Sequence, residues 1–390
     1  MRITFLCSGL EPGRDGVGDY TVRLAGEIVR QGHEASIIAL HDRHLVDATC
    51  VNPNTAAMMT GPTLRLPSSM RWRERVALTK DHLSSFGAQW VSLQFVPYGF
   101  SDKGIVSNLG RNLKLIAGEH LIHVMFHELW IGAYQNAPWK ERLVGIIQRV
   151  FIQRLHRCLS PAAVATSNGA YVGLLRRIGV PATVLPLFGN IPVLEGNGSG
   201  WFDEELKRAG LTSEGEERRS FWIFAFFGAL HPIWPPEPLF SYIASAAKSS
   251  RKTVVVAAIG RLGPGETLWQ RLNRDYGGAF RFLNLSEQPA ARISEFLQAV
   301  DFGIATSPWA LIGKSGSVAS MLEHGLPVIV NRDDVQFPDL RECEAASPLL
   351  IKMDETLSER LPSLMRLAPR STLPDVARMF LARIESTPPR

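Results

Sequence analysis

Short, strongly apolar runs alternate with helical patterns along almost the whole chain, and this alternation most limits how the chain can fold. The first runs are residues 2–7 (RITFLC), 34–40 (EASIIAL), 90–96 (WVSLQFV), 121–127 (LIHVMFH), 162–167 (AAVATS) and 182–187 (ATVLPL). A second series occupies residues 221–228, 253–260, 280–285, 301–306 and 326–330. Strands this apolar, separated by helices, predict parallel sheets covered on both faces. We therefore expect an α/β protein.

The composition changes near residue 190. Residues 195–220 are rich in glycine and charge, and we expect them to be exposed. A chain of 390 residues suits two domains. We predict a Rossmann-like domain at residues 1–186, a second at 187–365, and a C-terminal segment at 366–390 whose helix packs back on the first domain.

Composition and cysteine usage indicate a reduced, cytoplasmic globular protein. Apolar residues make up 45% of the chain and charged residues 20%, which is typical of soluble domains. The four cysteines lie far apart, so neither a disulfide framework nor a zinc cluster is expected. The apolar run at the start is too short for a signal peptide.

Positive charge gathers in the first half of the chain. Residues 1–186 hold 20 Lys and Arg against 13 Asp and Glu, a net charge of +7, whereas the remainder has a net charge of −2. An anionic partner and an ordinary solvated surface both fit this difference. In the basic stretch 140–157 one helical face carries Leu143, Ile146, Ile147, Val150 and Phe151. We expect that face to pack inward; peripheral docking on an anionic membrane is the alternative. No nucleic-acid recognition motif accompanies the charge.

Residues 313–330 (GKSGSVASMLEHGLPVIV) begin like a nucleotide-binding loop. A Walker-type loop needs a glycine five positions before Gly313, but Pro308, which has no N–H, stands there. An ATPase is therefore not expected. The remaining feature is the start of a short helix, at Lys314, Ser315, Gly316 and Ser317. Its N–H groups and positive dipole end predict a diphosphate site, with a simple capped helix as the alternative.

Four stretches resemble the GT-B glycosyltransferases, most closely their family 4. They are residues 12–38 (PGRDGVGDYTVRLAGEIVRQGHEASII), 93–104 (LQFVPYGFSDKG), 124–130 (VMFHELW) and 164–193 (VATSNGAYVGLLRRIGVPATVLPLFGNIPV), and residues 313–330 occupy the place of the family's donor-binding loop. The resemblance implies a GT-B fold, with two Rossmann-like domains facing an interdomain cleft. It also implies a sugar-nucleotide donor in the second domain.

The sequence departs from this family in its acidic motif. The family's Glu-x7-Glu pair precedes the Gly-Leu-Pro turn, and aligning on that turn places Ile312 and Ser320 at the two positions. Glu323 follows Ser320 by one helical turn and is a candidate to reach a similar surface; simple exposure is the alternative.

The family's Arg/Lys phosphate pair is also missing. After the strand at 221–228 the nearest residues are Ala229 and Trp234. Arg261 and Lys314 are candidates to replace the pair at the donor phosphates.

In the first domain, candidate site residues follow the predicted strands. Gly13, Gly16 and Gly18 allow the backbone to approach a ligand, but their spacing is not that of a nicotinamide-binding motif. Asp19 either caps the next helix or contacts the acceptor hydroxyl as a base. By resemblance His127 lies beside the donor sugar, with Glu128 orienting it; a plain buried histidine is the alternative. Further cleft-lining candidates are Tyr98, Ser167 and Asn168.

Together these features predict a glycosyltransferase of the hexosyltransferase type. It would move a sugar from a nucleotide diphosphate-sugar to a carbohydrate or lipid-linked acceptor, as in polysaccharide biosynthesis. We expect a retaining enzyme without a cofactor. We also expect that it needs no metal, because the chain has no Asp-x-Asp and the histidines in HDRH (41–44) are a weak metal motif. Two alternatives stay open, a sugar-nucleotide-binding homologue without turnover and a sugar-nucleotide epimerase.

Overall fold

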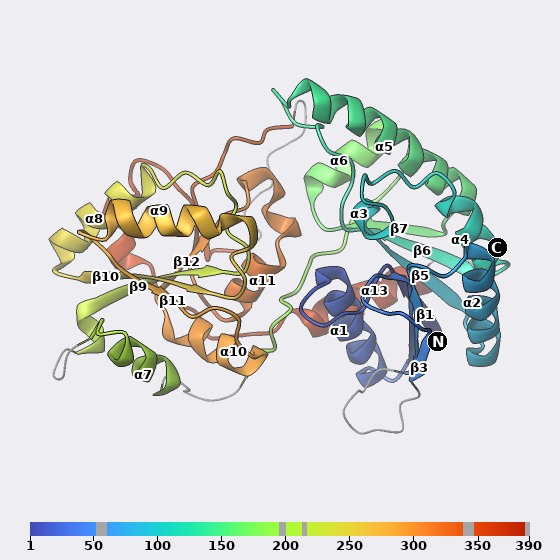
Figure 1. Cartoon of the computed structure of the whole chain (residues 1–390), viewed down its shortest axis with the longest axis horizontal. Helices are drawn as coiled ribbons and strands as arrows, with labels where there is room; N and C mark the ends of the chain where they lie inside the picture. Colours follow the sequence, from blue (N-terminus) through green and yellow to red (C-terminus); the bar gives the residue numbers. More distant parts are fainter. Residues whose placement is uncertain (52–60, 195–199, 213–216, 338–346, 387–390) are drawn as a thin grey trace. The chain divides into compact units, whose positions relative to one another are not determined.

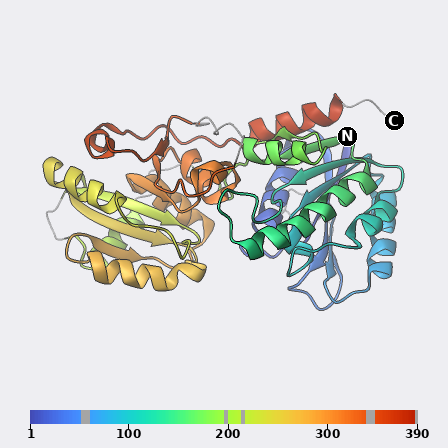
Figure 2. The ribbon, with the colours of Figure 1, turned by 90° about the horizontal axis from the view of Figure 1, so that it is seen from above.

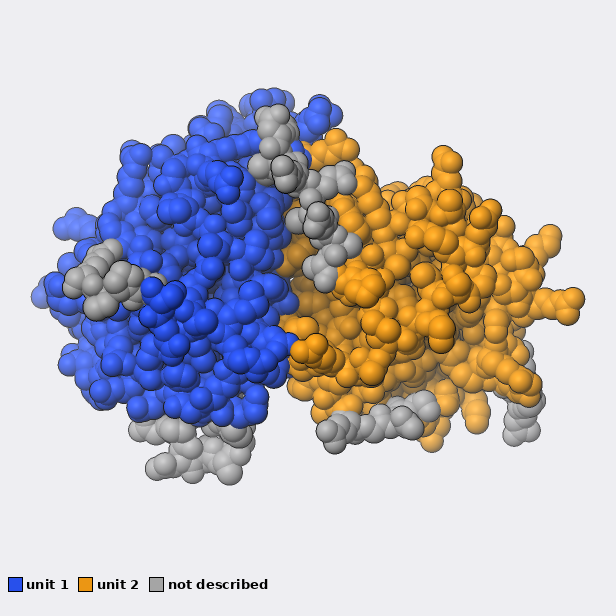
Figure 3. Space-filling view, turned by 180° about the vertical axis from the view of Figure 1, so that it is seen from behind, with its two compact units in different colours: residues 1–187, 337–341, 373–390 blue, residues 188–336, 342–372 orange. Residues whose placement is uncertain are grey.

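The structure is a computed structural model that describes residues 1–51, 61–194, 200–212, 217–337 and 347–386. The chain forms two compact units (Figure 1, Figure 3). The first contains Met1–Leu187 and the C-terminal helix α13 (Leu373–Glu385). The second contains Phe188–Gln336 and residues 347–372. Each unit has its own sheet.

The first unit has an eight-stranded sheet in the order β3-β4-β2-β1-β5-β6-β7-β8. Its strands are β1 (Arg2–Cys7), β2 (Glu34–Asp42), β3 (Thr49–Val51), β4 (Thr63–Pro67), β5 (Trp90–Phe95), β6 (Leu121–Phe126), β7 (Ala163–Thr166) and β8 (Thr183–Val184). All neighbouring strands are parallel except β3 and β4. The central strands β1 and β5 are the apolar runs foreseen from the sequence, and the edge strands β3 and β4 were not foreseen.

Helices in this unit follow the strands as crossover connections. They are α1 (Gly16–Arg30), α2 (Trp72–Phe86), α3 (Pro97–Phe100), α4 (Leu109–Ala117), α5 (Trp139–Leu159) and α6 (Gly169–Arg177). Helix α13, red in Figure 2, packs beside α1. Its Phe380 ring lies 5.7 Å from the ring of Phe5 in β1. The last helix of the chain therefore completes the core of the first unit.

Helix α5 corrects one expectation. Leu143, Ile146, Ile147 and Val150 are exposed rather than packed inward. The buried face instead carries Gly145 and Gln148 in the first half of the helix and Ile152, Leu155 and Leu159 in the second half. A Cβ atom on Gly145 would lie 2.0 Å from the carbonyl oxygen of Ile131, so only glycine permits this close approach. Gln148 is fully buried, and its amide bonds the backbone N–H of Ile131, the carbonyl of Lys103 and the hydroxyl of Tyr98.

The second unit has a six-stranded parallel sheet in the order β11-β10-β9-β12-β13-β14. The strands are β9 (Phe221–Phe227), β10 (Thr253–Ile259), β11 (Arg281–Asn284), β12 (Phe302–Ala305), β13 (Val328–Val330) and β14 (Leu350–Lys352). The helices are α7 (Gly200–Arg208), α8 (Leu239–Ser250), α9 (Glu266–Tyr276), α10 (Ala290–Ala299), α11 (Gly316–Glu323) and α12 (Leu357–Arg360). The predicted α/β class with two mainly parallel sheets is confirmed.

Apolar side chains fill both faces of the second sheet. On one face Phe224 and Phe226 of β9 pack against Phe302 and Trp234, with ring centroids 4.8 and 5.1 Å apart. On the other face the glycine-rich segment that we expected to be exposed contributes Phe202 of α7, which is fully buried. In the described part of the chain no helix is long and apolar enough to cross a membrane.

Candidate functional site

The strand order of the second sheet reverses between β9 and β12. Strands β10 and β11 extend from β9 to one side, and β12, β13 and β14 extend to the other. In open α/β sheets ligands bind at the carboxyl ends of the strands at such a reversal, because the loops there diverge and leave a crevice. The loops that follow β9 and β12 are therefore the place to look for a ligand site in this unit.

The N-terminal turn of α11 lies at this reversal. Strand β9 runs into Gly228, whose φ of +78° is a left-handed conformation that favours glycine. A Cβ atom on Gly228 would lie 3.9 Å from Cβ of Ser317, so the end of β9 and the start of α11 are in contact. Gly260, after β10, approaches Gly228 closely, since its Cβ would lie 3.3 Å from the Gly228 Cα atom. Gly228 and Gly260 therefore place no side chain beside the start of α11.

Ser315 caps α11 with its side chain. Its hydroxyl oxygen accepts a hydrogen bond from the backbone N–H of Val318, and its Oγ lies 3.1 Å from Oγ of Ser317. Within the described residues no acceptor pairs with the N–H groups of Gly316 and Ser317. Lys314 ends the preceding 3-10 turn (Trp309–Lys314), directly before the cap. Two N–H donors and the positive end of the helix dipole therefore remain for an anion.

The other candidate cation of this unit, Arg261, already has a carboxylate partner. It lies in the loop after β10, and its Nε donates to Oε1 of Glu287. The prediction that Arg261 contacts the donor phosphates stays a prediction, and such contact would have to compete with Glu287.

Sequence reasoning missed Arg332, a buried cation that follows the carboxyl end of β13. Its guanidinium donates to both carboxylate oxygens of Asp334, at 2.9 and 2.6 Å, and to the carbonyl of Thr306 after β12. The Thr306 hydroxyl in turn donates to the carbonyl of Ala229, after β9. Arg332 thus joins three loops at the strand reversal and lowers the pKa of Asp334. A lone arginine after a predicted strand was its only sequence signal.

Ser320 and Glu323 lie further along α11 and serve internal contacts. The buried Ser320 hydroxyl donates to the carbonyl of Gly316 and accepts from the backbone N–H of Asn190. Glu323 is buried, which excludes the alternative of simple exposure. Its Oε1 accepts from the backbone N–H and the hydroxyl of Thr372, at 2.7 and 2.5 Å. A substrate role for Glu323 stays a prediction.

In the first unit Asp15, and not Asp19, caps the helix that follows the glycine-rich loop after β1. Helix α1 begins at Gly16, earlier than expected, and the Asp15 carboxylate accepts from the N–H groups of Val17 and Gly18. The expectation that Asp19 caps the helix is therefore wrong. Asp19 accepts from the N–H of Gly13, and its pKa is raised, chiefly by burial.

Gly18 is needed for packing within the first unit. A Cβ atom at this position would lie 2.6 Å from the carbonyl oxygen of Gly9 and 3.2 Å from Cα of Leu10. The loop thus folds directly onto the start of α1. Close approach to a ligand, which we predicted for Gly16 and Gly18, stays a prediction, and the internal contact already requires glycine at position 18.

His127 belongs to a buried hydrogen-bonded chain that links β5 and β6. Its Nε2 lies 2.9 Å from Oε1 of Gln94, and Nε2 of Gln94 donates to Oγ of Ser92 at 2.8 Å. The chain ends at Nδ1 of His123, which lies 2.9 Å from that hydroxyl oxygen. Burial lowers the pKa of both histidines to about 3, so both are neutral near pH 7.

This chain fixes the protonation pattern of His127. An amide oxygen can only accept, so Nε2 of His127 carries the proton and Nδ1 is left as an acceptor. The Tyr20 ring of α1 packs edge-on against the imidazole, with centroids 4.8 Å apart. His127 therefore lies against the helix that also carries Asp19. Gln94, which sequence reasoning missed, is the residue bonded to its ring; an amide within an otherwise apolar strand was the available signal.

The remaining candidates of the first unit have local roles. The Tyr98 hydroxyl accepts from Gln148 of α5, so this side chain is directed to that helix. Asn168 caps α6 by accepting from the N–H of Tyr171, and its Nδ2 donates to Oγ of the buried Ser167. Glu128 directly follows His127 at the end of β6 and is half-buried. Ligand contacts for these four residues stay predictions. Within the described ranges, no three His, Cys, Asp or Glu side chains cluster as a metal site.

Comparison with known proteins identifies the fold. No family model matches the sequence, and no curated protein matches it. Among solved structures, Anabaena HepE in complex with UDP and glucose is 13% identical, with a TM-score of 0.54 over 85% of this chain and 80% of that chain. WaaG, a glycosyltransferase involved in lipopolysaccharide biosynthesis, is 14% identical, with a TM-score of 0.52 over 97% and 95%.

A third similar structure is a glycosyltransferase from Rickettsia africae. It is 11% identical, with a TM-score of 0.51 over 86% of this chain and 80% of that chain. At these identities the likeness concerns the fold, and the chain has the GT-B architecture of two Rossmann-like domains.

Proposed function

We propose that this protein is a family 4-like glycosyltransferase that takes its sugar from a nucleotide diphosphate donor. One observation carries the proposal: the N–H groups of Gly316 and Ser317, which have no acceptor among the described residues, lie beside Gly228 at the reversal of the second sheet. The GT-B fold supports it, since HepE, which shares that fold, binds UDP. In this proposal the domain at 187–365 holds the donor and the domain at 1–186 holds the acceptor.

The transfer step needs a leaving diphosphate whose negative charge is stabilised. Backbone N–H groups that already point at the site supply this stabilisation without reorganising, and such preorganised dipoles often contribute most of the rate enhancement. Lys314 adds a positive charge beside them, so a metal ion is not required in the proposal. Ser320 replaces a family carboxylate and bonds the backbone of Asn190, so we infer that the donor sugar hydroxyls are bound differently here.

His127 would contact the sugar as a neutral hydrogen-bonding group. Its Nδ1 can accept from a sugar hydroxyl, because Nε2 is already bonded to Gln94. With a pKa of about 3 the ring would not exchange a proton during turnover near pH 7. The acceptor would be a carbohydrate or a lipid-linked intermediate, and the reaction would retain the configuration of the anomeric carbon.

A charge substitution at the start of α11 separates anion binding from helix stability. An acidic residue in the first turn of a helix stabilises the helix, yet Ser317→Asp would repel a diphosphate. We expect wild-type protein to bind UDP, GDP or ADP in calorimetry and the variant to bind at least tenfold more weakly, with an unchanged or raised melting temperature. Ala291→Asp, exposed in the first turn of α10, is the matched control. Equal nucleotide affinity in wild type and Ser317→Asp would contradict the proposal.

Product analysis separates the proposed transfer from its two alternatives. A glycosyltransferase releases nucleotide diphosphate and forms a glycoside only when the acceptor is present, apart from slow donor hydrolysis. A binding protein without turnover is stabilised by the nucleotide but releases no product. An epimerase converts the donor sugar with no acceptor added. Formation of an epimerised donor, or stabilisation without any product across a panel of donors and acceptors, would replace the transferase assignment.

A further inference from the structure

Helix α5 presents a continuous apolar row to solvent. Five of the fifteen large apolar side chains exposed among the described residues lie on this helix. They are Trp139 (70% exposed), Leu143 (56%), Ile146 (52%), Ile147 (42%) and Val150 (37%). Their spacing of three or four residues places them along one face. The other exposed apolar residues are scattered, whereas this row needs an explanation.

The same helix is strongly basic. It carries Lys140, Arg142, Arg149, Arg154 and Arg157 against a single acidic residue, Glu141. The Glu141 carboxylate accepts from the hydroxyl of Tyr134, so it is already engaged. Across the described parts of the chain, no carboxylate pairs with Arg142 or Arg149. An exposed apolar row flanked by unpaired cations therefore lies along a helix of about 30 Å.

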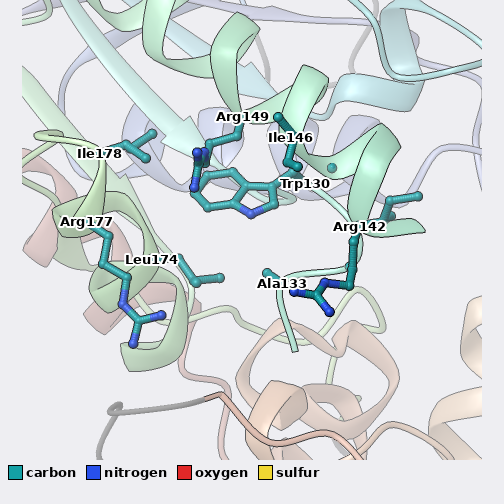
Figure 4. Close-up of a pocket in the computed structure, with 11 residues that line it drawn as sticks. Trp130, Ala133, Arg142, Ile146, Arg149, Leu174, Arg177 and Ile178 are labelled. Atoms are coloured by element: carbon teal, nitrogen blue, oxygen red, sulfur yellow. The ribbon is translucent and has the colours of Figure 1, made fainter. Parts of the chain in front are cut away.

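A hollow of about 300 Å³ adjoins this row on the side of helix α6. Figure 4 shows its walls: Trp130 and Ile146 lie beside Arg149, with Leu174 facing them from α6. Arg142 and Arg177 lie on opposite sides of it. A pocket with apolar walls and arginine side chains suits a phosphate group attached to a hydrophobic body.

We propose that α5 docks the protein on an anionic phospholipid bilayer. Leu143, Ile146, Ile147 and Val150 enter the boundary between headgroups and acyl chains, and a lipid phosphate occupies the hollow beside Arg142 and Arg149. The helix lies parallel to the surface, as amphipathic helices with a basic polar face do. Trp139 stands at its N-terminus, and tryptophan prefers the membrane–water interface.

Charge complementarity favours a bilayer over a second copy of the chain. Two α5 helices packed face to face would bring two sets of five cations together with one acidic residue each. An anionic bilayer instead neutralises these cations while the apolar row leaves water. Each basic residue near such a surface adds about 1 kcal/mol of attraction. The inference concerns binding alone and does not depend on the donor-site proposal.

Vesicle flotation of the full-length protein tests this inference. One set of vesicles is equimolar phosphatidylcholine and phosphatidylglycerol, and the other is phosphatidylcholine alone. We expect binding to the anionic vesicles that weakens as salt rises, and weak binding to the neutral ones. Arg142→Gln with Arg149→Gln should lower the partition coefficient on anionic vesicles by about thirtyfold. Ile146→Ser with Ile147→Ser should abolish flotation.

Matched controls come from the second unit. Ile233→Ser removes an isoleucine that is more exposed than Ile146 or Ile147, and Arg271→Gln removes an exposed arginine of α9. Both should bind vesicles within twofold of wild type. The inference is overturned if wild type does not float with anionic vesicles, or if the α5 variants bind as wild type does. It is also overturned if α5 forms a dimer in sedimentation that Ile146→Ser with Ile147→Ser dissociates and no variant changes flotation.

Discussion

The Nε2 atom of His127 lies 2.9 Å from Oε1 of Gln94, and this contact leaves the ring one defined acceptor, Nδ1. The imidazole is buried and packed edge-on against Tyr20. An imidazole in this position can bind and orient a hydroxyl group through Nδ1, and it does not exchange protons near neutral pH. The proposed transfer therefore relies on hydrogen bonding and electrostatics in both domains.

Burial of two neutral histidines predicts a loss of stability in mild acid. His123 and His127 have folded pKa values of about 3, below the unfolded value of 6.5. Their contribution is fully present above pH 6.5 and is lost as the pH falls toward 3, because the unfolded chain then binds protons that the folded protein does not. Between pH 5 and 4, where the unfolded histidine is protonated and the folded one is not, His127→Gln should reduce the pH slope of the unfolding free energy by about 1.4 kcal/mol per unit.

Urea unfolding at several pH values measures this slope, and the pH profile of kcat/KM provides a second reading. We expect that His127 contributes no ionisation near pH 6.5 to this profile, so that wild type and His127→Gln have the same profile shape in this range. A folded-state titration of the His127 ring near pH 6.5 in NMR spectra would contradict the assigned environment.

Gly18→Ala tests the packing of the loop onto α1. Alanine is about 1 kcal/mol better than glycine inside a helix. At position 18, however, its Cβ would lie 2.6 Å from the carbonyl oxygen of Gly9. We expect the substitution to destabilise the protein by about 1–3 kcal/mol in chemical denaturation. Gly278→Ala, where a Cβ meets no atom within 4 Å, should change stability by less than about 0.5 kcal/mol.

Glu323→Ala distinguishes an internal role from a ligand role. The substitution removes the carboxylate oxygen that accepts two hydrogen bonds from Thr372, so the variant should lose about 1–3 kcal/mol of stability. Nucleotide affinity in calorimetry should stay within twofold of wild type. An affinity loss with an unchanged melting temperature would instead make Glu323 a donor ligand.

Lys314→Ala should weaken nucleotide diphosphate binding by about 1–3 kcal/mol, the range for losing a charged hydrogen bond. The deficit should shrink at high salt, because exposed charges are screened. Lys248→Ala is the control, since this exposed lysine lies in the last turn of α8, which leads into the amino end of β10. Equal affinities for wild type and Lys314→Ala in titration calorimetry would remove Lys314 from the site.

The central strands were predictable because they are apolar throughout. Strands β1, β5, β9 and β10 are buried on both faces, and such runs are distinctive. The short edge strands β3 and β14 have three residues each and carry too little pattern to recognise. For α5 the periodicity was read correctly but the wrong face was assigned to the core. The buried face combines the apolar residues Ile152, Leu155 and Leu159 with Gly145 and Gln148. No rule based on hydrophobicity indicates the contacts of Gly145 and Gln148.

The candidate sites were predictable only where the backbone itself forms them. The Ser-Gly-Ser sequence after a strand indicated the N-terminus of α11, and the structure places a helix start there. Its role in binding stays a prediction. Gln94 and Arg332 were missed because they act through tertiary contacts with His127 and Asp334. A single sequence carries no trace of such partners.

A crystal structure with a bound nucleotide diphosphate is the sharpest test of the proposed donor site. We expect phosphate oxygens that accept hydrogen bonds from the backbone N–H groups of Gly316 and Ser317, with the nucleotide at the carboxyl ends of β9 and β12. A nucleotide bound elsewhere, or a diphosphate that makes no contact with this turn, would contradict it.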